Sequence, residues 1–80
     1  MADTDTRTNL RRIFSDILEI AVDAVNDDLS PDSCETWDSL THVRIITAVE
    51  EEFGVSFDTS EIFDMDRFAL FVDALDRARA

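Results

Sequence analysis

The sequence predicts an all-α fold in which three long helices and one short helix surround a single apolar core. Apolar residues make up 45% of the 80 residues and recur at helical spacing, which indicates amphipathic helices rather than disorder. The chain contains one Gly and one Pro, so it offers little material for the tight turns of β-hairpins. A chain of this length has room for one core, and we expect residues 1–80 to form one domain.

The first helix is predicted over about residues 7–25. Its apolar residues occupy the i, i+3, i+4 and i+7 positions that form one helix face. They are Leu10, Ile13, Phe14, Ile17, Leu18, Ala21, Val22 and Val25. Residues 1–6 are polar and are expected to be disordered.

A long loop is predicted over residues 26–38, between the first and second helices. Pro31 and a cluster of Asp and Ser residues interrupt the helical pattern there. Because a loop of this length needs anchors in a compact domain, we expect Leu29 and Trp37 to pack onto the core.

The second helix is predicted to begin near Asp38 and Ser39 and to end at Gly54, a residue type that often follows the last helical turn. At helical spacing, one arc of this helix is apolar and should face the core. It contains Val43, Ile45, Ile46, Val49 and Phe53. Leu40 lies about 140° from the centre of that arc, so packing of this helix onto the core does not explain it.

Two further helices complete the prediction. Asp58 followed by Glu61 resembles a capping pair, which favours a short helical turn at about 59–64. Asp64 or Asp66 is then expected to cap a last helix that extends to about residue 78. Its inward residues are predicted to be Phe68, Phe71, Val72 and Leu75.

The net charge narrows the choice of partners. Nineteen acidic residues against seven basic ones give a formal charge of −12, which disfavours nucleic acids and anionic membranes and favours basic proteins. No apolar run is long enough to insert into a membrane. The single cysteine, Cys34, cannot form an internal disulfide, which is typical of a reducing cytoplasm. We expect a cytoplasmic monomer.

Ser39 is the candidate functional residue. A serine at a helix start is most often the N-cap, but Asp38 directly before it can fill that position. The residue three positions after Ser39 is His42 rather than Glu or Gln, so no capping box supports Ser39 as the cap. Its hydroxyl then lies on the first turn, where the helix dipole permits a phosphate ester without requiring one.

The Asp38-Ser39-Leu40 triplet at the head of the second helix resembles the attachment motif of acyl carrier proteins. The resemblance covers about residues 7–78 and includes the long loop and the acidic end of the second helix before Gly54. With Trp37 in front, the motif is similar to that of free-standing carriers. The resemblance implies an acyl-carrier-like four-helix bundle. It also implies that a phosphopantetheinyl transferase attaches 4′-phosphopantetheine from coenzyme A to Ser39, and that the arm holds acyl groups as thioesters.

The resemblance also implies roles for neighbouring residues. Asp38 and Leu40 would flank the attached arm. Leu40, Glu50 and Glu51 would contact partner enzymes, which include an acyl-loading ligase or transferase and ketosynthase-type enzymes with basic docking patches. Arg44 reverses the charge expected on this face, which indicates a dedicated set of partners.

Several alternatives stay open at this stage. His42 is either a partly buried histidine bonded to the loop or part of the mouth of an acyl pocket. The cargo can belong to fatty-acid, polyketide or related biosynthesis, or the chain can be an aminoacyl or peptidyl carrier. An unmodified acidic interaction module is a third class. The sequence shows no nucleophile and base in a catalytic pattern, so we do not predict an enzyme. The acidic residues lack the spacing of a calcium loop, so no metal site is predicted.

Overall fold

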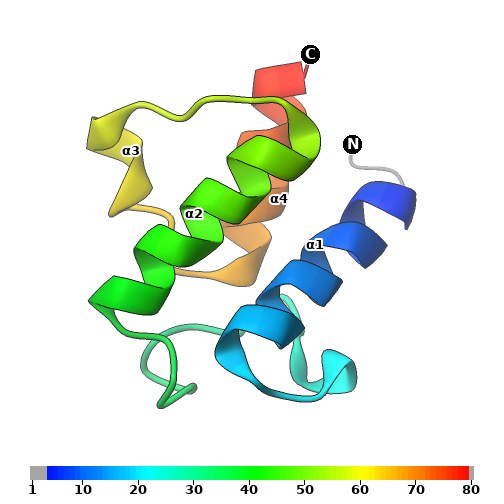
Figure 1. Ribbon diagram of the computed structural model, residues 1–80, viewed down its shortest axis with the longest axis vertical. Helices are drawn as coiled ribbons and strands as arrows, with labels where there is room; N and C mark the ends of the chain where they lie inside the picture. Colours follow the sequence, from blue (N-terminus) through cyan, green and yellow to red (C-terminus); the bar gives the residue numbers. More distant parts are fainter. Residues whose placement is uncertain (1–3, 80) are drawn as a thin grey trace.

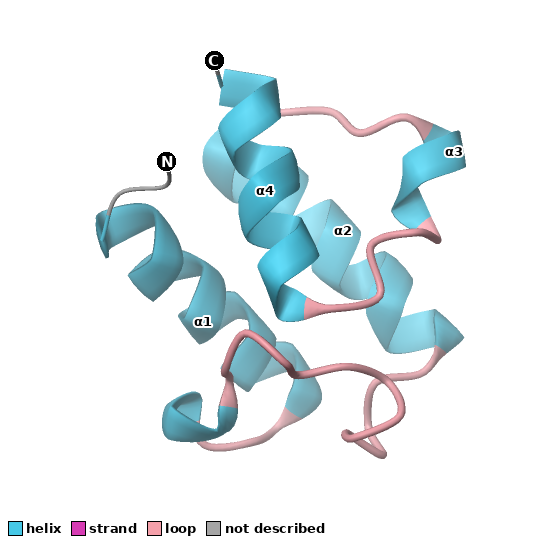
Figure 2. Ribbon diagram, turned by 180° about the vertical axis from the view of Figure 1, so that it is seen from behind, coloured by secondary structure: helices cyan, strands magenta, loops and turns pink. Residues whose placement is uncertain are grey.

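The computed structural model describes residues 4–79, and within this range the chain is helical without strands. The elements are α1 (Thr4–Leu18), the 3-10 turn η1 (Val22–Ala24), α2 (Ser39–Phe53), α3 (Thr59–Ile62) and α4 (Phe68–Arg79). In Figure 1, α2 crosses the front of the molecule with α4 behind it and α1 to one side. Figure 2 shows the same bundle from behind, with the long loop closing its lower end. The predicted all-α bundle of three long helices and one short helix is confirmed.

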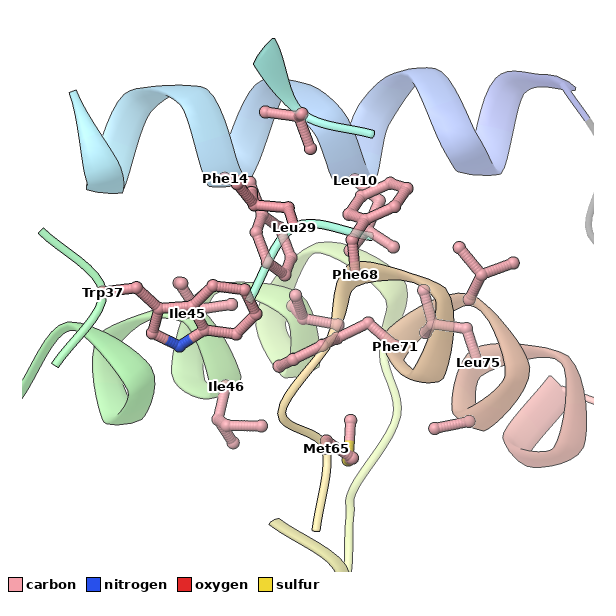
Figure 3. Close-up of a cluster of buried hydrophobic side chains, with 14 of the residues drawn as sticks. Leu10, Phe14, Leu29, Trp37, Ile45, Ile46, Met65, Phe68, Phe71 and Leu75 are labelled. Carbon is pink, nitrogen blue, oxygen red and sulfur yellow. The ribbon is translucent and has the colours of Figure 1, made fainter. Parts of the chain in front are cut away.

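The core forms where α1, α2 and α4 meet the long loop. Phe14 lies at its centre, with ring centroids 5.3 Å from Trp37, 5.2 Å from Phe68 and 4.9 Å from Phe71, all in edge-to-face geometry. Figure 3 shows these rings between α1 and the other two helices. Edge-to-face contacts are a favoured arrangement of aromatic pairs, so one side chain of α1 contacts two other segments, the long loop through Trp37 and α4 through Phe68 and Phe71. The largest fully buried side chains are Leu10, Phe14, Leu18, Ile45, Val49, Phe68, Phe71 and Leu75.

The first helix ends earlier than predicted. Glu19 has a left-handed φ of 57°, the amide of Ile20 donates to the carbonyl of Ser15 at 3.2 Å, and the Ser15 hydroxyl donates to the carbonyl of Ile20 at 2.6 Å. A hydrogen bond that spans six residues around one left-handed residue is a common way for a helix to end. The apolar pattern therefore continues past the helix: Val25 is buried from the loop, while Val22 on η1 is 48% exposed.

The expected disorder of residues 1–6 is wrong for its last three residues, because Thr4–Thr6 belong to α1. Thr6 is buried, since it lies one turn before Leu10 on the same helix face. Residues 1–3 lie outside the described residues.

The long loop is held as predicted. Leu29 and Trp37 are both buried against the core. The hydroxyl of Thr36 also donates to the carbonyl of Leu18 at 2.7 Å, which joins the end of the loop to the end of α1. The loop is therefore fixed at both its middle and its end.

The start of α4 differs from the prediction. The helix begins at Phe68, and the carbonyl of Arg67 accepts from the amide of Phe71 at 3.4 Å, so Arg67 rather than Asp64 or Asp66 precedes the first turn. The amides of Phe68 and Ala69 donate to loop carbonyls, those of Leu29 and Asp27, at 3.0 and 3.3 Å. Backbone groups of the long loop thus take the place of an acidic cap.

The remaining boundaries agree with the sequence. Gly54 ends α2 with a left-handed φ of 64°, and Asp58 and Glu61 form a capping box at α3. The prediction that Val43 faces the core is wrong, because it is 49% exposed. Val43 lies about 100° from the centre of the arc formed by the buried residues of α2 at helical spacing.

Candidate functional site

Ser39 is the first residue of α2, and its side chain is exposed. Asp38 before it is the N-cap: its carboxylate accepts from the amide of Thr41 at 2.9 Å. In return, the amide of Asp38 donates to the Thr41 hydroxyl at 2.8 Å. The prediction that Asp38 caps the helix is confirmed. The reciprocal role of Thr41 was missed, although a polar residue at the third helical position is the expected signal.

The helix start is already occupied by a negative charge. The amide of Thr41 stabilises the Asp38 carboxylate and holds its pKa below the ordinary value of 3.8. Because the amide of Thr41 donates to Asp38, this first-turn amide is not available to a phosphate on Ser39. A phosphate ester on Ser39 would lie next to the carboxylate of Asp38, the preceding residue.

A hollow of about 320 Å³ lies beside Ser39. Three segments form its walls: the long loop, the first turn of α2 and the link between α3 and α4. The lining residues are Pro31, Trp37, Asp38, Ser39, His42, Phe63 and Asp66. The site thus combines an exposed hydroxyl, an aromatic surface and two carboxylates.

His42 connects the walls of this hollow. It is buried, its Nδ1 accepts from the indole N–H of Trp37 at 3.0 Å, and its Nε2 lies 2.7 Å from the carbonyl oxygen of Ile62. Because Nδ1 accepts, the ring proton is assigned to Nε2, which donates to Ile62. The predicted loop-bonded histidine is confirmed, and the same ring also lines the hollow.

An apolar strip runs along the exposed side of α2. Leu40 is 69% and Val43 is 49% exposed, one turn apart. Arg44 and Glu51 are exposed on the same helix, and Arg44 makes no ion pair with another residue of the described range. The exposure of Leu40 agrees with its place outside the core, while Val43 was missed because it was assigned to the core.

Glu50 has a role inside the fold. Its carboxylate accepts from the amide of Phe57 at 2.9 Å, and its carbonyl accepts from the amides of Gly54 and Val55. The side chain therefore stabilises the turn that follows α2. Of the two acidic residues predicted to contact partners, Glu51 is the one whose side chain is exposed.

Cys34 lies in the long loop and packs into the hydrophobic core. It is buried, and its Sγ lies 3.3 Å from the hydroxyl oxygen of Thr36. Since the Thr36 hydroxyl gives its proton to the carbonyl of Leu18, the thiol of Cys34 is the donor in the first contact.

The cap predicts a pH-dependent stability. Because the folded pKa of Asp38 is lowered, its stabilising effect is present above about pH 4 and is lost as the pH falls through the folded pKa. We expect Asp38→Ala to melt at a lower temperature than wild type at about pH 7, and the difference in melting temperature to narrow as the pH falls through the folded pKa of Asp38. Asp38→Asn is the control, because its amide oxygen can cap without a charge. A gap that stays constant with pH would contradict the role of the carboxylate.

Comparison with known proteins identifies the family. Residues 9–75 match the family described as "Phosphopantetheine attachment site", a range from α1 to within α4. Comparison with curated proteins gave no match. Among residues 4–79, no helix is long and apolar enough to cross a membrane. Proteins of the matched family carry a covalently attached 4′-phosphopantetheine and work with partner enzymes. The chain belongs to the phosphopantetheine-binding carrier proteins.

Proposed function

We propose that this protein is an acyl carrier in which the Ser39 hydroxyl is esterified with 4′-phosphopantetheine. The observation that carries the proposal is the position of Ser39, exposed on the first turn of α2 at the rim of the hollow. Its hydroxyl makes no hydrogen bond within residues 4–79, because Asp38 and Thr41 form the cap between them. The hydroxyl is therefore free to form a new bond without loss of the helix start.

Attachment is a phosphoryl transfer. The Ser39 oxygen attacks the phosphorus of coenzyme A that bears the pantetheine, the new P–O bond forms, and the bond to the leaving 3′,5′-adenosine bisphosphate breaks. A base of the transferase takes the hydroxyl proton. The arm supplies a terminal thiol that forms thioesters with acyl groups. The chain itself orients the hydroxyl and presents it, and we propose that it has no catalytic activity of its own.

Intact mass measurement tests the attachment. Incubation with coenzyme A, Mg²⁺ and a promiscuous phosphopantetheinyl transferase should add one phosphopantetheine to the wild type and none to Ser39→Ala. Ser60→Ala, an exposed serine on the first turn of α3, is the matched control and should be modified like the wild type. No mass gain with several transferases would favour an unmodified acidic interaction module instead.

We also propose that partner enzymes dock on the exposed side of α2. Leu40 and Val43 supply the apolar contact, and Arg44 and Glu51 supply charges at its edge. The partners are a phosphopantetheinyl transferase, a loading enzyme and synthase-type enzymes of fatty-acid, polyketide or related biosynthesis. Loading assays with acyl and aminoacyl substrates separate an acyl carrier from an aminoacyl carrier. The free thiol of Cys34 supports a cytoplasmic location.

Arg44 is predicted to select the partners. Arg44→Glu should lower kcat/KM with the cognate partner by about threefold to tenfold and raise it with synthases that dock on acidic carriers, because edge charges control encounter and orientation. Arg12→Glu on α1, where the arginine is also exposed, is the control because it makes the same charge change on another helix. Equal kinetics of Arg44→Glu and wild type with every synthase would contradict this role.

A further inference from the structure

Three side chains beside Ser39 form a stack that runs from the core to the surface. The ring centroids of Trp37 and His42 lie 6.0 Å apart, with 18° between the ring planes. The ring centroids of His42 and Phe63 lie 6.1 Å apart, with 24° between the planes. Trp37 and His42 are buried, whereas Phe63 is 67% exposed. We call these residues the ring stack. Its outermost member is an aromatic ring that other residues cover only in part.

The ring stack and Ser39 line the same hollow. A group carried on a flexible arm attached to Ser39 can reach Phe63 when the arm folds back, and a short flexible tether gives such a group an effective concentration of about millimolar. The volume of about 320 Å³ lies at the small end of the range of ligand pockets. It suits a group the size of one ring and the atoms next to it.

The charges of the hollow restrict the group further. Asp38 and Asp66 contribute carboxylates, and none of the other lining residues is a lysine or an arginine. Thr41 keeps the carboxylate of Asp38 in its charged form through the capping hydrogen bond. A free carboxylate on the cargo would enter a hollow whose lining includes two negative residues and no positive one.

From this arrangement we propose that the hollow holds an aryl group of the cargo, without a free carboxylate, stacked on Phe63 as a fourth ring. The inference rests on the proposed attachment at Ser39 and names the class of acyl group that the carrier holds. An alkyl group in the hollow gains only from loss of exposed apolar area, whereas an aryl group also gains from ring stacking.

Thioester hydrolysis measures this preference. A phosphopantetheinyl transferase attaches the arm to Ser39 together with its acyl group, from benzoyl-, hexanoyl- or malonyl-coenzyme A. The hydrolysis rate of each thioester on the protein is then divided by the rate of the same acyl thioester of free pantetheine. We expect the benzoyl thioester to be protected about 2- to 12-fold more than the hexanoyl thioester, which corresponds to the usual gain from one aromatic pair. The malonyl thioester should show no protection. Equal corrected rates for benzoyl and hexanoyl would overturn the proposal, as would protection of malonyl.

Two variants distinguish stacking on the ring of Phe63 from burial of the cargo against any apolar side chain. Phe63→Leu keeps an apolar side chain but removes the ring, and it should abolish the benzoyl preference while leaving the hexanoyl rate unchanged. Val22→Ala, which shortens an exposed apolar side chain on η1, is the matched control and should keep the preference. A benzoyl preference that survives in Phe63→Leu would overturn the proposal.

Fluorescence gives a readout independent of hydrolysis. Trp37 is the single tryptophan of the chain, and it lines the hollow. Loading with benzoyl should change its emission in the wild type and leave it unchanged in Phe63→Leu. Failure to gain mass at Ser39 would reject the carrier function itself, whereas a normal mass gain with an unprotected benzoyl group and unchanged emission would reject only the aryl site.

Discussion

Replacing Phe14 by alanine is expected to lower the free energy of unfolding by about 3–5 kcal/mol. Phe14 is fully buried and contacts Trp37, Phe68 and Phe71 edge to face, so its removal leaves a cavity among three other rings. A core of this size rarely supplies more than about 3–5 kcal/mol of net stability. Most of the folded population should therefore be lost, as circular dichroism in increasing urea would show.

The matched control for Phe14→Ala is Phe63→Ala. Both substitutions remove the same atoms, but Phe63 is 67% exposed, so its loss should cost less than about 1 kcal/mol. The comparison isolates burial from residue type. Equal losses of stability in the two variants would contradict the central place of Phe14.

The hydrogen bond between Trp37 and His42 carries the second large effect. His42→Phe keeps a ring in place but leaves the buried indole N–H of Trp37 without its acceptor, which costs about 1–3 kcal/mol. Trp37→Phe removes the donor and part of the ring packed against Phe14, so it should also destabilise the protein. Both variants weaken the connection between the long loop and the start of α2.

The double variant tests whether the two residues act as a pair. With both partners replaced by phenylalanine, no buried polar group of the pair is left unsatisfied. We expect its loss of stability to be smaller than the sum of the single losses by about 0.5–3 kcal/mol, the usual range for residues in direct contact. Strictly additive losses in urea unfolding would show that the hydrogen bond contributes nothing specific.

Most of the helical architecture could be predicted from the sequence, because local signals coincide with the elements. The capping residues Asp38 and Asp58 and the left-handed Gly54 mark the observed ends of α2 and α3. The apolar periodicity gave the wrong end for the first helix. The spacing of apolar residues continues to Val25, but the chain leaves the helix at Glu19. Amphipathic spacing marks apolar residues that can be buried, but Val22 on the same stripe is exposed, and the spacing does not distinguish a helix from an anchored loop.

Some features of the site could likewise be predicted from the sequence, and others could not. The sequence alone determined the family resemblance, the position of Ser39 on the first turn of α2 and the capping role of Asp38, because each depends on residues within a few positions of one another. The reciprocal hydrogen bond of Thr41 in the cap is also local, although it was not predicted from the sequence. Only the tertiary structure decided that the carboxylate of Glu50 bonds to the turn after α2. It also decided that Pro31, Phe63 and Asp66 gather around Ser39. These residues come from segments far apart in the chain, and packing of the long loop and the α3–α4 link onto the core brings them together.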